Sequence, residues 1–156
     1  MASIDAPALG GVYKLVELAR ATPGGPSSHA EPVPIAKFSE GKGTLPGPHQ
    51  VWRFDRPGGF DDVIALAGED PRALREAMRL PGDAEARPLL VPALAGGART
   101  EPAESLDAIR ARVRAGLDAL PAEAHLLEEG PAAVVAKVSP RLEALVSEVR
   151  ARFVAH

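Results

Sequence analysis

The residues best suited to chemistry lie in one short stretch, residues 36–54, whose sequence is AKFSEGKGTLPGPHQVWRF. The stretch combines two lysines, two hydroxyl side chains and a late glycine, namely Lys37, Lys42, Ser39, Thr44 and Gly47. Ammonium groups attract phosphate as point charges, and glycines let backbone N–H groups approach an anion closely. The stretch therefore predicts a loop that binds phosphate or pyrophosphate. A solvated hairpin loop would have the same residues, and spacing alone favours that second interpretation.

Other arrangements of reactive side chains are weaker. The phosphate-loop pattern G-x-x-x-x-G-K-[ST] fails because Gly43 follows Lys42. His49 lies beside the lysines and could contact a phosphate, although a histidine at the start of an exposed strand is more common. The other histidines are too scattered for a metal site. Two pairs of adjacent carboxylates could bind Mg²⁺, but such pairs are more often turn or cap residues. The scattered histidines are His29, His125 and His156, and the carboxylate pairs are Asp61-Asp62 and Glu128-Glu129. No catalytic triad stands out, so the spacing predicts neither catalytic residues nor a metal site.

Composition excludes several classes of protein. A chain of 156 residues that is 46% hydrophobic fits one ordinary folded domain. The absence of cysteine excludes a disulfide scaffold and any thiolate metal site, and is typical of a cytoplasmic protein. The net charge of −3 gives no support for nucleic-acid binding. No apolar run approaches the roughly 20 residues of a membrane span, and the N-terminus lacks the features of a signal peptide.

Short strands and turns are predicted in the first two thirds of the chain. A Pro- and Gly-rich insert over residues 21–33 follows the first strand. Asp70 as cap and Pro71 as first helical residue predict a short helix that ends by Leu80. Pro88 and Pro92 place the last strand at a sheet edge. The predicted strands are Gly11–Leu18, Ile35–Phe38, Gln50–Phe54, Asp61–Gly68 and a run from Arg87 that ends in a Gly96-Gly97 turn.

Two longer helices are predicted in the last third. The first starts at Ser105 and is stopped by Pro121, and the second starts at Ser139-Pro140. An apolar run over residues 132–138 predicts a buried strand between them. The helical faces consist of Leu106, Ile109, Val113, Leu117 and Leu120 in the first, and of Leu142, Leu145, Val146, Val149 and Phe153 in the second. Strands early and helices late predict an α+β fold with short, mostly antiparallel strands.

Several stretches carry a family resemblance. In chain order they are DAPALGGVYKLVEL, KFSEGKGTLPGPHQVWRF, RPLLVPALAGG and the tail SLDAIRARVRAGLDALP with KVSPRLEALVSEVR. Together they resemble the C-terminal part of nicotinate phosphoribosyltransferase. The resemblance implies a barrel-edge strand segment over residues 1–20, an insert over 21–33 and a C-terminal α+β domain over 34–156. Most of the family's α/β barrel is expected before the point where this sequence begins.

The resemblance also implies roles for the loop residues. Lys37 and Lys42 match the two lysines of the family's K-x-S…K-x-T-L-P-G segment, which implies that they face the phosphates of the sugar substrate. Ser39, Thr44 and Gly47 match the same segment and would shape the loop. Lys14 matches the family's V-Y-K-L-V strand. Two positions depart from the family pattern: His49 stands where lysine is usual, and Gly43 stands where a β-branched residue is usual.

The reaction implied by the resemblance joins nicotinate to phosphoribosyl pyrophosphate in NAD biosynthesis, a pyridine nucleotide pathway. It is a glycosyl transfer coupled, in the manner of a ligase, to ATP hydrolysis, with Mg²⁺. The family's phosphorylatable histidine and nicotinate-binding residues are expected upstream, so we expect the chain alone to lack most catalytic residues. The alternative is a non-catalytic structural or interaction domain. An uncovered apolar strand near the N-terminus predicts self-association or binding to a separately encoded barrel piece.

Overall fold

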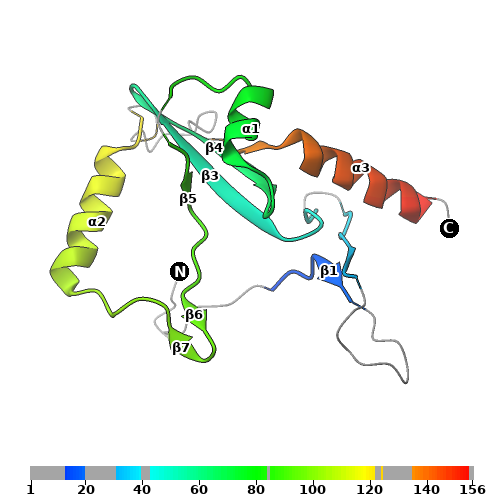
Figure 1. Cartoon of the computed structure of the whole chain (residues 1–156), viewed down its shortest axis with the longest axis horizontal. Helices are drawn as coiled ribbons and strands as arrows, with labels where there is room; N and C mark the ends of the chain where they lie inside the picture. The colour runs from blue at the N-terminus through cyan, green and yellow to red at the C-terminus, as the bar shows by residue number, and fades with distance from the viewer. Residues whose placement is uncertain are drawn as a thin grey trace. The chain divides into compact units, whose positions relative to one another are not determined.

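The described part of the chain has an α+β architecture (Figure 1). It combines helices with short strands that are mostly antiparallel, which confirms the predicted fold class. Contacts divide the chain into two compact units, the first made of Met1–Pro48 and Leu142–His156 and the second of His49–Arg141. The computed structural model describes residues 13–19, 31–39, 43–83, 85–121, 124 and 135–154.

A four-stranded sheet forms the base of the second unit, in the order β5-β3-β4-β8. Its centre is a long antiparallel hairpin of β3 and β4, joined by Pro57 and Gly58. Gly58 has φ +76°, a conformation that glycine adopts at little cost. The strands β3 and β5 pair antiparallel, and β4 and β8 pair parallel. The strands are β3 (His49–Arg56), β4 (Gly59–Leu66), β5 (Arg87–Pro88) and β8 (Lys137–Val138).

The strand predictions for this unit hold with shifted ends. The structure extends the predicted Gln50–Phe54 strand at both ends, and β4 covers most of the apolar run that starts at Asp61. Pro88 lies at a sheet edge, as predicted, because proline cannot donate a ladder hydrogen bond. The buried strand predicted over residues 132–138 reduces to Lys137–Val138. Val135 is exposed, and residues 132–134 lie outside the described residues.

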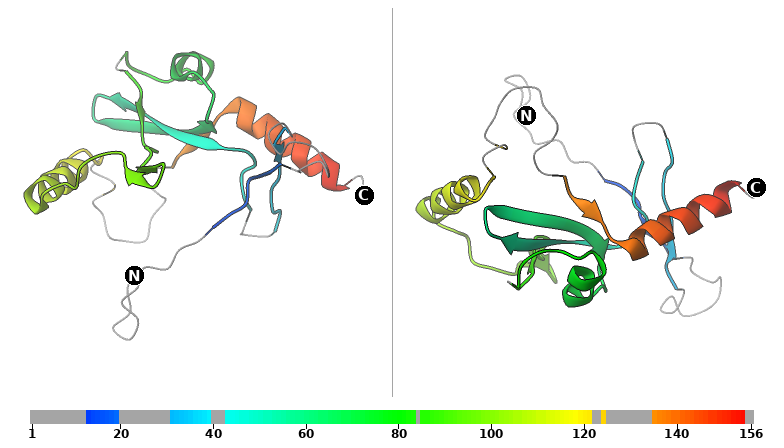
Figure 2. Two further views of the ribbon diagram at one scale, coloured as in Figure 1. Left: turned by 60° about the horizontal axis from the view of Figure 1, so that its bottom comes forward. Right: turned by 90° about the horizontal axis from the view of Figure 1, so that it is seen from above.

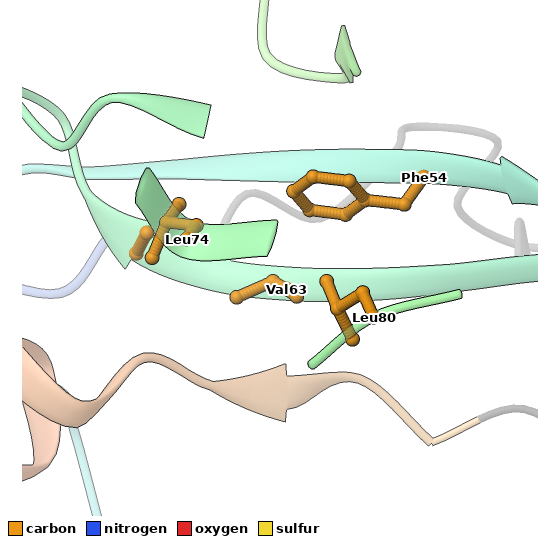
Figure 3. Packing of buried hydrophobic residues seen from close by; sticks show 5 residues of the cluster. Phe54, Val63, Leu74 and Leu80 are labelled. Atoms are coloured by element: carbon orange, nitrogen blue, oxygen red, sulfur yellow. The ribbon is translucent and has the colours of Figure 1, made fainter. Parts of the chain in front are cut away.

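One face of the hairpin carries the hydrophobic core, and the helix α1 (Pro71–Ala77) covers it (Figures 1 and 2). Phe54, Val63 and Ala65 point from the sheet toward Leu74 and Leu80. Figure 3 shows the labelled members of this cluster facing one another. Each fully buried aliphatic side chain contributes roughly 1.5–3 kcal/mol relative to its exposed state. These five residues therefore fix α1 on the sheet.

The helix α1 starts where its sequence predicts and ends at Ala77, before the predicted limit at Leu80. The Asp70 side chain accepts a hydrogen bond from the Arg72 N–H at 3.2 Å, and Pro71 occupies the first turn. Such a cap satisfies one of the free N–H groups at the helix start. The helix ends before Arg79, which has φ +52°. The Leu80 N–H then donates to the Arg75 carbonyl at 3.0 Å, which closes the last turn.

A buried polar contact joins the end of β4 to the residue before α3. The Oε1 atom of Glu69 accepts from the Leu66 N–H at 2.8 Å and from the Ser139 hydroxyl at 2.6 Å. Ser139 is fully buried, and its N–H donates to the Ile64 carbonyl at 2.9 Å. Removing one partner of a buried hydrogen bond leaves an unsatisfied group, which costs about 1–3 kcal/mol. These bonds fix Ser139, the residue before α3, to the sheet of the second unit.

The segment after β5 is exposed and ends in a long helix. Strands β6 (Leu94–Ala95) and β7 (Ala98–Arg99) form a hairpin whose turn is Gly96-Gly97, as predicted. Both turn residues have positive φ, +57° and +80°. The helix α2 (Leu106–Asp118) follows, and the Ser105 side chain caps it by accepting from the Ala108 N–H. No residue of α2 is buried.

In its described residues, the first unit contains two short strands and most of the helix α3 (Pro140–Val154), which starts at the predicted proline. Strands β1 (Glu17–Leu18) and β2 (Val33–Pro34) pair antiparallel. The strand predicted over Gly11–Leu18 is therefore present only in its last two residues, and residues 11–12 lie outside the described part. Tyr13 is 98% exposed. Residues 20–30, most of the predicted insert, also lie outside that part.

The prediction of a strand over Ile35–Phe38 is wrong. The strand in this region is β2, at Val33–Pro34. The backbone of Lys37 does not enter a strand ladder, because it bonds across the loop to Thr44. Among the described residues, no helix has the length and apolar character that a membrane span requires.

Candidate anion-binding loop

The loop from Lys37 to Thr44, called the lysine loop below, is closed by two hydrogen bonds at its base. The Lys37 N–H donates to the Thr44 hydroxyl at 2.7 Å, and the Thr44 N–H donates to the Lys37 carbonyl at 3.0 Å. Segments 31–39 and 43–48 therefore run side by side at this point (Figure 2). Thr44 uses both its hydroxyl and its backbone to close the loop.

A single carbonyl holds the two ends of the loop region to the N-terminal segment. The Val16 carbonyl accepts from the Ile35 N–H at 2.9 Å and from the Gly47 N–H at 2.8 Å. Gly47 is buried and has φ +78°, a conformation that disfavours any residue with a β-carbon. Pro46 is fully buried beside it. The glycine is therefore needed for the backbone turn, and the sequence alone could not separate this role from close approach to an anion.

The helix α3 contacts the loop at Phe38, between two predicted site residues. The Phe38 ring meets the Phe153 ring edge-on, with centroids 6.0 Å apart and an interplanar angle of 76°. The Arg150 guanidinium lies over the same ring, 5.0 Å from its centroid. Phe38 is half-buried, whereas its neighbours Lys37 and Ser39 are exposed. The loop is thus attached to α3 through Phe38.

The predicted site residues are only partly brought together. Lys37 and Thr44 meet at the base of the loop, and Ser39 lies two residues along from Lys37. Lys42 lies outside the described residues. His49 starts β3, in the second unit. Lys14 is exposed in the N-terminal segment, which has no strand at that position.

The carboxylates of Asp61 and Asp62, which could bind Mg²⁺ on spacing alone, pair with basic side chains in the structure. The carboxylate of Asp62 binds Arg53 through two hydrogen bonds of 2.8 and 2.7 Å, and Asp61 pairs with Arg56 and Lys137 at 3.0 and 2.8 Å. Burial raises the pKa of Asp61, but hydrogen bonds and charges from Lys137 and Arg56 outweigh it and lower the pKa overall.

The carboxylate of Asp62 also affects its partner. Its hydrogen bond raises the pKa of Arg53. No group of three metal-ligating side chains occurs within the described ranges. Glu128-Glu129, His29, His125 and His156 fall outside those ranges.

Sequence reasoning missed the contact between α3 and the loop. Arg150 and Phe153 are three residues apart in a helix, so they share one face. That spacing could have revealed a cation beside an aromatic ring. It could not have revealed Phe38 as their partner, because the pairing joins residues more than a hundred positions apart.

Comparison with known proteins relates this α+β chain to the phosphoribosyltransferases. Two curated proteins from Mycobacterium tuberculosis, strains CDC 1551 / Oshkosh and ATCC 25618 / H37Rv, are each 36% identical to it over 148 residues. Both are named nicotinate phosphoribosyltransferase pncB2. The aligned region is 94% of this chain and 27% of each relative.

The chain therefore matches a C-terminal portion of the nicotinate phosphoribosyltransferase family, which confirms the resemblance carried by its motifs. It spans only about a quarter of the length of the curated relatives that it matches. No protein-family model and no solved structure matches the chain.

Proposed function

We propose that this chain provides part of the phosphoribosyl pyrophosphate site of a nicotinate phosphoribosyltransferase. The reaction joins nicotinate to phosphoribosyl pyrophosphate, and gives nicotinate mononucleotide for NAD biosynthesis. It consumes ATP and uses Mg²⁺, and it would take place in the cytoplasm. The observation that carries the proposal is the closed Lys37–Thr44 loop, in a chain that is 36% identical to enzymes of that name.

The loop can hold a pyrophosphate group by charge. Its base is fixed by the two Lys37–Thr44 bonds, so the exposed Lys37 side chain starts from a defined point on the backbone. Lys42 follows five residues later and would add a second cation. Hydrogen bonds that involve an ionised partner contribute roughly 1.5–3 kcal/mol each. The role of the chain is therefore substrate binding, and the catalytic groups would come from the part of the family that it does not match.

The test is a titration of the isotope-labelled chain with phosphoribosyl pyrophosphate and Mg²⁺, followed by amide NMR. Signals of residues 36–48 should shift, and Lys37→Ala or Lys42→Ala should raise the Kd by about ten-fold or more. Arg114→Ala, which removes an exposed cation from α2, should leave the Kd unchanged. Unchanged binding in both lysine variants, or shifts confined to other residues, would reject the loop as the site.

A second candidate is a non-catalytic structural or interaction domain. The exposed apolar residues of α2 favour it, since Leu106, Val113 and Leu117 are 70%, 52% and 53% exposed. Large apolar patches seldom stay bare on monomers. Its partner would be a second copy or a separately encoded barrel piece, and its test is the state of association.

A further inference from the structure

We infer that Arg150 of α3 is a phosphate-binding cation that acts together with Lys37. The inference rests on the proposed function, and it adds a residue from the far end of the chain. Its basis is the contact between the Arg150 guanidinium and Phe38, the residue between Lys37 and Ser39. Arg150 is thereby held next to the loop at the point where the loop begins.

The contact with Phe38 leaves the hydrogen-bonding groups of Arg150 available. The guanidinium lies over the Phe38 ring, 5.0 Å from its centroid. A cation–π contact is an electrostatic attraction to the ring and gives the N–H donors no oxygen acceptor. Those donors match the geometry of a phosphate group, which an arginine can bind through two parallel bonds. The contact with the ring also restricts the side chain, which lowers the entropy lost when a ligand binds.

The charge of Arg150 is not matched by a carboxylate among the described residues. Its neighbour Arg152, on the same helix, pairs with Glu148. For Arg150, the ring of Phe38 is the one contact found in the described part of the chain. A cation that is held in place without an acidic partner can attract an anion strongly. The two arginines therefore differ in function although both lie near the end of α3.

Phe153 contacts the same ring and supports this arrangement. Its edge-on contact with Phe38, at 6.0 Å, fixes the ring on which Arg150 rests. Aromatic pairs of this kind contribute a defined orientation as well as burial. The cation, the ring and the loop backbone at Lys37 are consequently coupled, and Phe153 acts as a positioning residue.

The experiment compares variants of the whole chain in amide NMR titrations with inorganic pyrophosphate and with phosphoribosyl pyrophosphate. Arg150→Met keeps an unbranched side chain over the ring but removes the charge, and we expect it to raise both Kd values by about ten-fold. Arg150→Lys keeps the charge without the planar donors, so its Kd values should lie between those of the wild type and Arg150→Met. Arg152→Ala is the matched control and should bind as the wild type does.

The outcomes separate this inference from the proposed function. Wild-type affinity in Arg150→Met, together with weakened binding in Lys37→Ala, would overturn the role of Arg150 and leave the loop as the site. Wild-type affinity in all of these variants would overturn both. An equal loss in Arg150→Met and Arg150→Lys, with displaced Phe38 signals in the unliganded spectra, would mean that Arg150 only supports the loop, which also overturns the inference. Phe153→Leu should weaken binding less than Arg150→Met does.

Discussion

The helices α2 and α3 carry apolar residues at the same spacing, yet they differ in burial. Leu142 and Val149 of α3 are 0% and 1% exposed, whereas no residue of α2 is buried. The two helices also begin differently. α3 follows Ser139, which is buried and bonded to Glu69, while α2 follows an exposed segment and is capped only by Ser105.

The difference shows what helical periodicity can and cannot predict. Periodic spacing predicts which side chains share a face of a helix. It does not predict what covers that face, because this depends on contacts with distant parts of the chain or with another molecule. In α3, Leu142 and Val149 are covered within the described chain. In α2 the apolar face has no such cover, and this is the observation that the following experiments address.

The largest expected effect contrasts the two faces in stability. Leu142→Ala should reduce the free energy of unfolding by about 2–5 kcal/mol, because it leaves a cavity at a fully buried site. Leu117→Ala on α2 should cost less than about 0.5 kcal/mol, because the side chain is already half-exposed. Urea unfolding followed by circular dichroism measures both. Equal losses would mean that the α2 face is covered in solution.

The next effect concerns association through α2. If a second copy covers the exposed residues, Val113→Glu with Leu117→Glu should raise the Kd for self-association by about ten-fold or more. Sedimentation velocity over a range of concentrations measures it. Ala108→Glu, on the same helix but outside the apolar face, serves as the control and should leave association unchanged.

The N-terminal segment provides a competing explanation for association. Tyr13 and Leu15 are exposed there, and Leu15→Lys places a charge on that surface. Association that is lost in Leu15→Lys but kept in the α2 variant would assign the contact to the N-terminal segment. A chain that stays monomeric at all concentrations would reject self-association altogether.

The smallest effect concerns acid stability at Asp61 of β4, which pairs with Lys137 of β8. The folded pKa of Asp61 is lowered, so its ionised form stabilises the fold above the unfolded pKa of about 3.9. This contribution is lost as the pH falls through the folded pKa. Asp61→Asn should therefore be less stable than the wild type at pH 7, by less than about 1 kcal/mol, and the difference should shrink toward pH 3.

The matched control for acid stability is Glu104→Gln, near the start of α2. The pKa of Glu104 is also lowered, by its hydrogen bond to Arg112, but this pair is exposed. Solvent screens exposed pairs, so the variant should follow the wild type across the same range. An acid response larger in Glu104→Gln than in Asp61→Asn would reverse the expected order of the two regions.

Local rules predicted much of the fold. Asp70-Pro71 and Ser105 mark the starts of helices, and Gly96-Gly97 marks a hairpin turn, because each depends only on neighbouring backbone groups. The strand over Ile35–Phe38 failed for the opposite reason. Its backbone bonds go to Thr44 and to the Val16 carbonyl, and no local signal indicates those partners.

The candidate site was predictable in its residue types and not in its surroundings. Lys37 and Thr44 could be identified from the loop sequence and the family motif. The attachment of Phe38 to α3 could not, since it joins residues far apart in sequence. The resemblance supplied the proposed substrate class, whereas composition and spacing alone ended at a possible anion loop.

The shared carbonyl of Val16 has a consequence for how the chain can vary among relatives. The Ile35 and Gly47 N–H groups both end at this one oxygen, so the segments between these residues begin and end at fixed points. Lengthening a segment with fixed ends is inexpensive, because each doubling of the length of a loop costs only about 0.6 kcal/mol. Insertions and deletions should therefore accumulate between residues 19 and 31 and between 39 and 43. No insertions or deletions are expected directly beside Val16, Ile35 and Gly47. These three residues can therefore be used to align more distant members of the family.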